Sequence, residues 1–184
     1  MLDVRELQRR AGAYRPEEFE RRYRGLFFVG AMAPLPTQSD HGFERGSTLN
    51  DLEAMPRRRA RDPGSDDEVP FVLRIRKTER NHATHHISVG RAANNDVILL
   101  HPTVSKLHAL LVVEPDAEGL QLGRLLLQDA GSSNGTRVNG VAAQPLGRSA
   151  TPIAPGDQIV FGHVTCTLVD ARSLRTWVQR LAPV

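Results

Sequence analysis

Three short stretches of the sequence carry side chains that suit a phosphate group. Arg91 offers a planar fork of N–H donors, Ser105 a hydroxyl and Lys106 a compact positive charge, while the Asn134 amide can both donate and accept. A phosphorylated threonine carries roughly two negative charges and several acceptor oxygens. These side chains could therefore hold such an anion, provided that the fold brings the three stretches together.

The segments around these stretches have the periodicity of β-strands. Phe71, Leu73 and Ile75 alternate with arginines, which is the pattern of a half-buried strand. Similar short runs follow, separated by turn signals, at a spacing typical of an all-β sandwich and not of βαβ units. The further predicted strands are 85–89, 96–100, 107–113, 124–128, 136–138, 158–161 and 164–169.

The order of the three stretches resembles the signature of the forkhead-associated (FHA) domain. Gly90-Arg91, Ser105-x-x-His108 and Asn134-Gly135 match the family's Gly-Arg, Ser-x-x-His and Asn-Gly, and the resemblance covers about residues 70–170. It implies an all-β, FHA-type two-sheet β-sandwich that binds phosphothreonine peptides as a non-catalytic signalling adaptor. The implied partners are phosphothreonine-containing proteins and a Ser/Thr protein kinase.

The resemblance also implies a role for each residue of the site. Arg91, Ser105 and Lys106 would hold the phosphate. Asn134, helped by Ser133, would bond the backbone of the bound peptide. The remaining implied residues are Thr103, where the family often reads the third residue after the phosphothreonine, and the supporting residues Gly90, His108 and Gly135.

Each of these residues also has a purely structural explanation. Arg91 could pair with a surface carboxylate, Ser105 could cap a turn, and Lys106 could be a solvated charge. Ser105 and His108 do not form a convincing nucleophile–base pair, because residues three apart at the start of a strand point to opposite faces and no orienting acid is evident. The sequence therefore predicts no enzyme and indicates no cofactor.

A second Asn-Gly pair lies five residues after the first. Asn139-Gly140 follows the predicted strand 136–138 and is expected to close an ordinary hairpin, because both residue types tolerate positive φ. The first pair, Asn134-Gly135, is then left for the peptide contact that the resemblance implies.

The chain divides by composition into four segments. Helical patterns at 4–11 and 16–28 precede a stretch rich in Pro, Gly and charge, after which the strand pattern begins. The expected segments are a helical N-terminal segment at 1–30, a flexible linker at 31–69, the FHA domain at 70–170 and a C-terminal helix at 171–184 that packs on the sandwich.

The linker contains Thr37 and Thr48, each followed three residues later by an aspartate, which is a recurrent preference of the family at that position. Our hypothesis is that phosphorylated Thr37 or Thr48 binds the FHA site of the same chain or of a second copy, so that the protein self-associates through its N-terminal segment. The alternative is two ordinary linker threonines.

Composition and charge exclude several classes of protein. The chain has 184 residues, of which 40% are apolar, and a net charge of +3. Its single cysteine, Cys166, excludes an internal disulfide and is expected to be buried. The charged N-terminus lacks an apolar signal region, and no run reaches the roughly 18 apolar residues of a membrane span. A cytoplasmic protein without a membrane partner is expected.

Two further groupings have ordinary explanations. His82, His85 and His86 lack the carboxylate or cysteine that would complete a metal set, so no metal site is expected. The arginine-rich run at 57–61 lies among acidic residues, which favours a solvated linker over a nucleic-acid site. The rival to the adaptor is a phosphate-independent scaffold or assembly protein that binds a partner through a face of the sandwich.

Overall fold

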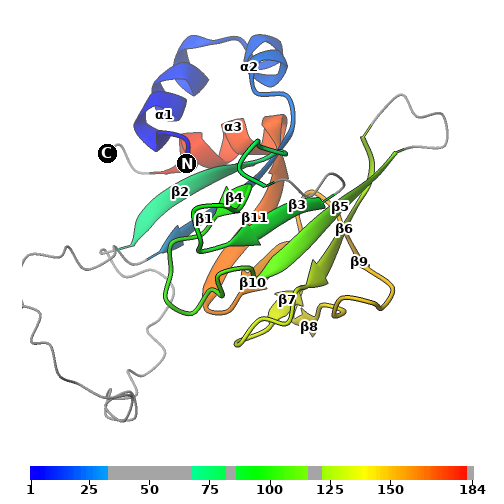
Figure 1. Ribbon diagram of the computed structural model, residues 1–184. Coiled ribbons are helices and arrows are strands. Elements are labelled where there is room, and N and C mark those ends of the chain that lie inside the picture. The colour runs from blue at the N-terminus through cyan, green and yellow to red at the C-terminus, as the bar shows by residue number, and fades with distance from the viewer. Residues whose placement is uncertain (33–67, 82–85, 116–121, 182–184) are drawn as a thin grey trace, which may run out of the picture.

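Two β-sheets pack face to face, and helices cover the outer face of one of them (Figure 1). The computed structural model describes residues 1–32, 68–81, 86–115 and 122–181. The predicted two-sheet β-sandwich is confirmed. Among the described residues, no helix is both long and apolar enough to cross a bilayer.

The larger sheet has the strand order β2-β1-β11-β10-β7-β8, and every neighbouring pair in it is antiparallel. The smaller sheet has the order β4-β3-β5-β6-β9, with only β3 and β4 parallel. The strands of the larger sheet are β1 Leu26–Met32, β2 Val69–Ile75, β7 Thr136–Val138, β8 Val141–Ala142, β10 Gln158–Phe161 and β11 Val164–Asp170. Those of the smaller sheet are β3 His86–Gly90, β4 Val97–Ile98, β5 Ala109–Pro115, β6 Leu122–Asp129 and β9 Thr151–Ile153.

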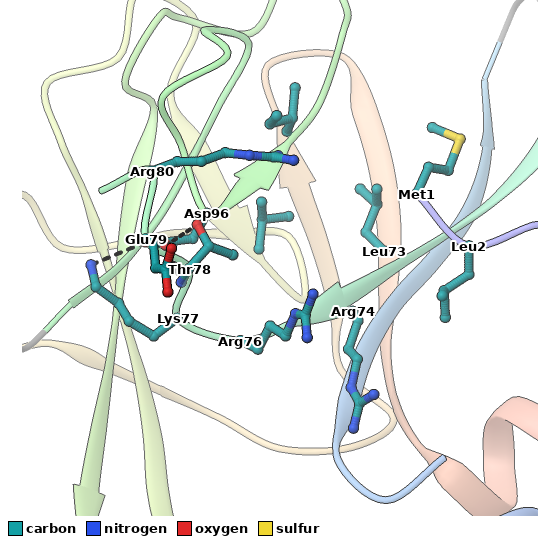
Figure 2. Close-up of a pocket in the computed structure, with 12 residues that line it drawn as sticks. Met1, Leu2, Leu73, Arg74, Arg76, Lys77, Thr78, Glu79, Arg80 and Asp96 are labelled. Carbon is teal, nitrogen blue, oxygen red and sulfur yellow. Dashed lines mark hydrogen bonds and ion pairs between the residues drawn. The ribbon is translucent and has the colours of Figure 1, made fainter. Parts of the chain in front are cut away.

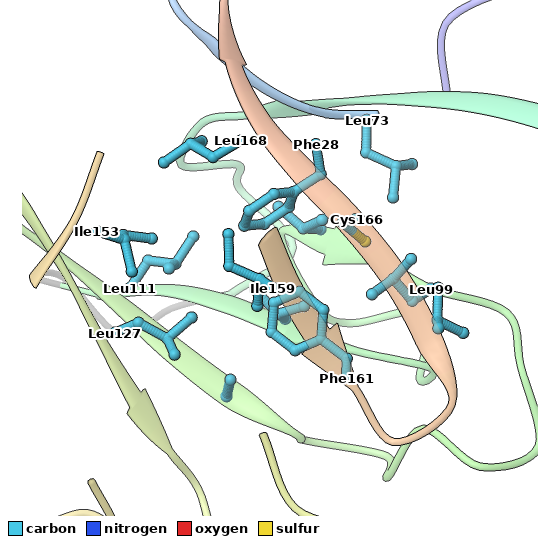
Figure 3. Packing of buried hydrophobic residues seen from close by; sticks show 14 of the residues in the cluster. Phe28, Leu73, Leu99, Leu111, Leu127, Ile153, Ile159, Phe161, Cys166 and Leu168 are labelled. Carbon is cyan, nitrogen blue, oxygen red and sulfur yellow. The ribbon is translucent and has the colours of Figure 1, made fainter. Parts of the chain in front are cut away.

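The main core lies between the sheets (Figure 3), where alternate side chains of each strand meet. Phe28 and Phe161 stack edge to face at its centre, with ring centroids 5.4 Å apart. Cys166 is buried in the same core, as predicted, and burial raises the pKa of its thiol. The sandwich is thus a rigid base for the loops at its ends.

A second core joins the helices to the outer face of the larger sheet. Helices α1 (Val4–Ala13) and α3 (Ala171–Arg180) begin at aspartate caps, and α2 (Pro16–Arg22) begins with a proline, which suits a first helical position. The buried residues of this core are Leu7, Ala11, Phe19, Tyr23, Phe27, Val29, Val72, Val169, Ala171, Leu174 and Val178.

The helix predicted over 16–28 is wrong beyond the end of α2, because Leu26–Met32 forms strand β1. This strand lies between β2 and β11 in the larger sheet. Phe27 packs under the helices and Phe28 in the main core, so the run is apolar on both faces. A doubly buried strand lacks the alternation that distinguishes it from a helix.

A domain boundary at residue 70 would therefore separate a central strand from its sheet. Met32 and Val69, near the two ends of the predicted linker, pair with each other as the last residue of β1 and the first of β2. Residues 33–67, with Thr37, Thr48 and the arginine-rich run, lie outside the described residues, as do His82 and His85.

The other predicted elements are largely confirmed. Helix α1 extends the predicted 4–11 by two residues, and α3 occupies the predicted C-terminal helix. The predicted strands from 71 onward correspond to β2–β7, β10 and β11, with shifted ends. Strand β9 was not predicted, because its Thr-Pro-Ile sequence is short and contains a proline.

Candidate functional site

The three loops named from the sequence meet at one end of the sandwich. They are the β3–β4 loop with Arg91, the β4–β5 loop with Ser105 and the β6–β7 loop with Asn134. The Arg91 N–H donates to the Ser105 carbonyl at 3.0 Å, which joins the first loop to the second. The Asn134 side-chain amide donates to the carbonyl of Thr103 at 2.8 Å, which joins the third loop to the second.

Two positively charged side chains stand exposed at this end, Arg91 and Lys106. The four ion pairs within the described residues involve neither of them. The structural alternative for Arg91, a surface carboxylate partner, therefore has no support in the described part of the chain. Both cations are in a position to meet an anion from solvent.

Ser105 is held in place through its hydroxyl and its backbone. Its Oγ accepts a hydrogen bond from the Ser133 N–H at 3.0 Å, and Ser133 Oγ lies 3.5 Å away. Its own N–H donates to His108 Nδ1 at 3.0 Å. The strand start expected to hold Ser105 and His108 is wrong, because both residues lie in a loop before β5 begins. The ring is bonded to the backbone of Ser105.

The fully buried imidazole of His108 bridges two of the loops. Because Nδ1 accepts from Ser105, Nε2 carries the proton and donates to the Gly135 carbonyl at 3.2 Å. Burial lowers the pKa of His108, although the Gly135 bond and the Asp129 charge act in the opposite direction. The neutral ring therefore fixes the spacing between the Ser105 and Asn134 loops.

Thr103 is engaged inside the protein. Its hydroxyl lies 2.8 Å from His101 Nδ1 and accepts from the His163 N–H at 3.0 Å. Its carbonyl receives the Asn134 amide. Thr103 thus ties the second loop both to the third loop and to the turn between β10 and β11.

Gly90 lies where two loops approach most closely. A Cβ added there would stand 2.3 Å from the Lys106 carbonyl oxygen and 2.9 Å from Asn95 Nδ2. The first contact is with backbone, which cannot rotate away. Only glycine therefore allows Arg91, the next residue, to remain beside the Ser105 loop.

We predict that Gly90→Ala destabilises the protein by about 3 kcal/mol, because overpacking against backbone forces the strand end to move. Gly12→Ala, in α1 with nothing within 4 Å of the new Cβ, should instead stabilise it by about 0.5–1 kcal/mol. Urea unfolding of the two variants beside the parent measures both effects. Equal, small changes in both would contradict the tight approach at Gly90.

The Arg91 loop is held by two buried side chains, Asn95 and Asp96. The sequence predicted no role for either of them. Asn95 donates from Nδ2 to the Ala92 carbonyl at 2.9 Å and to the Lys106 carbonyl at 2.6 Å. Asp96 accepts from the Ser88 N–H at 2.9 Å. Burial would raise the pKa of Asp96, but its hydrogen bonds outweigh that effect and hold the pKa at about 2.

Asp129 does the same for the third loop. Its carboxylate accepts from the N–H groups of Gly131 and Ser132 at 2.9 and 2.8 Å and from the Thr136 hydroxyl at 2.6 Å. These bonds lower its pKa against the opposing effect of burial. Short polar residues beside turn glycines are the signal that could have identified such loop anchors.

The two Asn-Gly pairs have different conformations. Asn139 and Gly140 both have positive φ, 51° and 83°, and close the hairpin between β7 and β8, as predicted. Asn134 has no positive φ, and only Gly135 does. The first pair therefore does not form the same kind of turn, and its asparagine side chain joins two loops.

Comparison with known proteins agrees with this arrangement. Residues 87–162 match the family described as the FHA domain. No curated protein sequence matches the chain. Similar solved structures include the FHA domain of the CT664 protein from Chlamydia trachomatis, at 18% identity over 79% of this chain and 98% of that one, with a TM-score of 0.43. The MEK1 FHA domain in complex with a phosphothreonine peptide of HOP1 is 19% identical over 54% of this chain and 88% of that one, with a TM-score of 0.42.

A third solved structure, from work on phosphothreonine-dependent FHA domain interactions, is 23% identical over 59% of this chain and 88% of that one, with a TM-score of 0.39. The family match covers β3 to the end of β10, and so contains all three loops described above. This chain therefore contains an FHA domain.

Proposed function

We propose that this protein is a non-catalytic adaptor that binds phosphothreonine peptides at the loops carrying Arg91, Ser105 and Asn134. The observation that carries the proposal is the convergence of these loops, joined by direct hydrogen bonds, beneath two exposed cations. Its implied partners are substrates of a Ser/Thr protein kinase, because such kinases produce phosphothreonine.

Each side chain has a defined part in this proposal. Arg91 contacts the phosphate with its planar fork and Lys106 adds charge. The Ser105 hydroxyl accepts a hydrogen bond from the Ser133 N–H, and its own proton, which makes only a long 3.5 Å bond to Ser133 Oγ, can be redirected to a phosphate oxygen. The Asn134 amide gives one N–H to Thr103, and its second N–H and its carbonyl oxygen remain for the peptide backbone.

Thr103 has a more limited part than the family resemblance alone would give it. Because its hydroxyl is committed to His101 and His163, only its methyl group is left to meet a bound peptide. We propose that selectivity at the third residue after the phosphothreonine comes from apolar contact there.

The direct test is calorimetric titration of the full chain with a peptide of residues 43–53, Phe-Glu-Arg-Gly-Ser-Thr-Leu-Asn-Asp-Leu-Glu, with and without phosphate on Thr48. We expect binding of the phosphorylated peptide alone. A degenerate phosphothreonine library covers the case in which this sequence is not preferred. Absence of phosphate-dependent binding in both would refute the adaptor proposal.

We further propose that phosphorylated Thr37 or Thr48 binds the same loops, in its own chain or in a second copy. Met32 and Val69 are paired, so residues 33–67 leave and re-enter the sheet at one point. That point is beside the start of β11, preceded by Gly162 and His163, which bond to Gly135 and Thr103 of the loops. The inserted segment therefore begins and ends at the loop end of the sandwich.

Thr48 suits the site of its own chain better than Thr37 does. It lies 16 residues beyond Met32, and Thr37 lies only five. At about 3.3 Å per extended residue, these lengths reach about 53 Å and 17 Å. The longer reach allows the segment to turn and enter a site from several directions, whereas Thr37 is better placed to meet a second copy.

We expect phosphorylation of Thr48 to weaken binding of an external phosphothreonine peptide by about tenfold or more, because a tethered ligand has an effective concentration up to about millimolar. Calorimetry on phosphorylated and unphosphorylated full chain measures this, and light scattering detects association between copies. Thr48→Ala, treated with the same kinase, is the control. Unchanged peptide affinity after phosphorylation of both Thr37 and Thr48 would refute the internal ligand and leave the adaptor proposal intact.

One observation favours the rival scaffold function as well. Leu110, Val112 and Leu126 lie on neighbouring strands β5 and β6, at positions that alternate with the core residues Leu111 and Leu127. They therefore form an apolar outer face on the smaller sheet, where a solvated sheet would carry polar residues. A partner that still binds the full chain after Arg91→Ala, and is lost with Leu126→Lys, would support the scaffold.

A further inference from the structure

A groove of about 810 Å³ opens between the sheets, on the side where β2 and β4 are the edge strands (Figure 2). Arg74, Arg76, Lys77 and Arg80 line it, together with Glu79 and Asp96. Positive side chains thus outnumber negative ones by two. None of the four positively charged residues has a proposed role in the phosphothreonine site, and Asp96 contributes to that site only by holding the Arg91 loop.

Two of the four cations already have partners within the protein. Arg74 donates to the Arg24 carbonyl at 2.7 Å and lies over the ring of Phe27, 5.9 Å from its centroid. Lys77 donates to the His86 carbonyl at 2.8 Å and forms an ion pair with Asp96. These two side chains shape the wall of the groove.

Arg76 and Arg80 are both exposed, and both line the groove (Figure 2). Neither is in any of the four ion pairs of the described residues. Asp96 cannot neutralise them, because its carboxylate already accepts from Ser88 and Thr78 as well as from Lys77. Among the described residues of the lining, Glu79 is the only other acid. Two positively charged guanidinium groups therefore line one open groove in which few negative charges offset them.

We propose that this groove binds an acidic peptide segment of a partner protein, independently of phosphothreonine. A peptide fits better than a small anion, because the groove follows the edge of β2 and is also lined by the exposed Met1 and the half-buried Ile98. Along that edge the Leu2 N–H already bonds the Val72 carbonyl, so the chain itself pairs one extended residue with β2, and a partner peptide would continue this pairing. Alternating acidic and apolar residues would match both features.

The groove and the loop site are separate. Strand β2 runs from Val69, at the loop end, to Ile75, and Arg76 to Arg80 follow at its other end. A partner with a phosphothreonine and a distant acidic stretch could therefore contact both sites. This second contact goes beyond the proposed function and does not depend on it.

The test uses the full chain and a fluorescein-labelled octapeptide of alternating glutamate and valine, measured by fluorescence polarisation at low salt. We expect saturable binding, and we expect Arg76→Glu with Arg80→Glu to weaken it by about tenfold or more, since like charges then face the peptide. An octapeptide of alternating lysine and valine should not bind.

The matched control is Arg148→Glu with Arg180→Glu, which makes the same change in net charge at exposed positions outside the groove. This variant and Arg91→Ala should both bind the acidic peptide within about twofold of the parent. Absence of binding by the parent chain would overturn the proposal. If the control pair lost as much affinity for the acidic peptide, the effect would come from net charge and not from the groove. If Arg91→Ala lost as much affinity, the acidic peptide would bind at the loop site.

Discussion

Arg91→Ala should weaken binding of a phosphothreonine peptide by about thirtyfold or more, which corresponds to about 2 kcal/mol. The guanidinium is the only planar, fork-shaped donor proposed to contact the phosphate, and without it the charge of the phosphate is met by Lys106 alone. The change should not unfold the protein, because the Arg91 side chain is exposed and the loop is held by the backbone bond to Ser105.

Calorimetry with the phosphorylated and unphosphorylated peptides measures this effect on the full chain. Arg91→Lys separates charge from shape: it should recover part of the affinity but not all, since an ammonium cannot make the bidentate contact. Arg180→Ala, which changes an exposed arginine in the last turn of α3, should bind as the parent does. If Arg91→Ala bound the phosphorylated peptide with unchanged affinity, the phosphate would not be at this site.

The residues of the candidate site could be named from the sequence because Gly90-Arg91, Ser105-x-x-His108 and Asn134-Gly135 match the FHA signature. Arg91 follows the last residue of β3, and Ser105 and Asn134 lie in the next loops at the same end of the sandwich. Strands of period two determine where the chain reverses, and the reversals bring the loops together.

The residues that anchor these loops could not be predicted from the sequence. Asn95, Asp96 and Asp129 act through hydrogen bonds to backbone groups that only the folded chain brings near. Asn95 bonds the carbonyl of Lys106, which is 11 residues away, and the spacing of apolar residues in the sequence does not predict such a contact. The groove was missed for the same reason, because β2 and β4 come from different sheets and meet only at their edges.

Strand β1 was predicted as part of a helix for a different reason. Its residues are apolar on both faces, so the run from Leu26 fits the helical face that begins at Phe19 as well as it fits a strand. What decides between them is the pairing of β1 with β2 and β11, far along the chain. The predicted boundary at residue 70 consequently assigned a strand from the interior of the larger sheet to an N-terminal extension.

Removing residues 1–69 should therefore leave a chain that does not fold. The truncation deletes β1 from between β2 and β11 and removes α1 and α2 from the outer face of the sheet. Phe27, Phe28 and Val29 are each at most 1% exposed. At about 1.5–3 kcal/mol for each buried side chain, their loss alone approaches the 5–15 kcal/mol of stability that a typical domain has.

The matched control keeps β1 and removes only the insertion. Because Met32 pairs with Val69, an Asn-Gly turn can join these two residues as a tight hairpin in place of residues 33–68. This variant should unfold cooperatively, and should gain about 2.5 kcal/mol from its shorter loop, since loop-closure entropy falls by about 0.6 kcal/mol with each halving of loop length. Near-ultraviolet circular dichroism and thermal unfolding compare both variants with the parent. A sharp transition in the chain that begins at residue 70 would mean that β2 and β11 can close the sandwich without β1, and the N-terminal segment would then be an accessory to the domain.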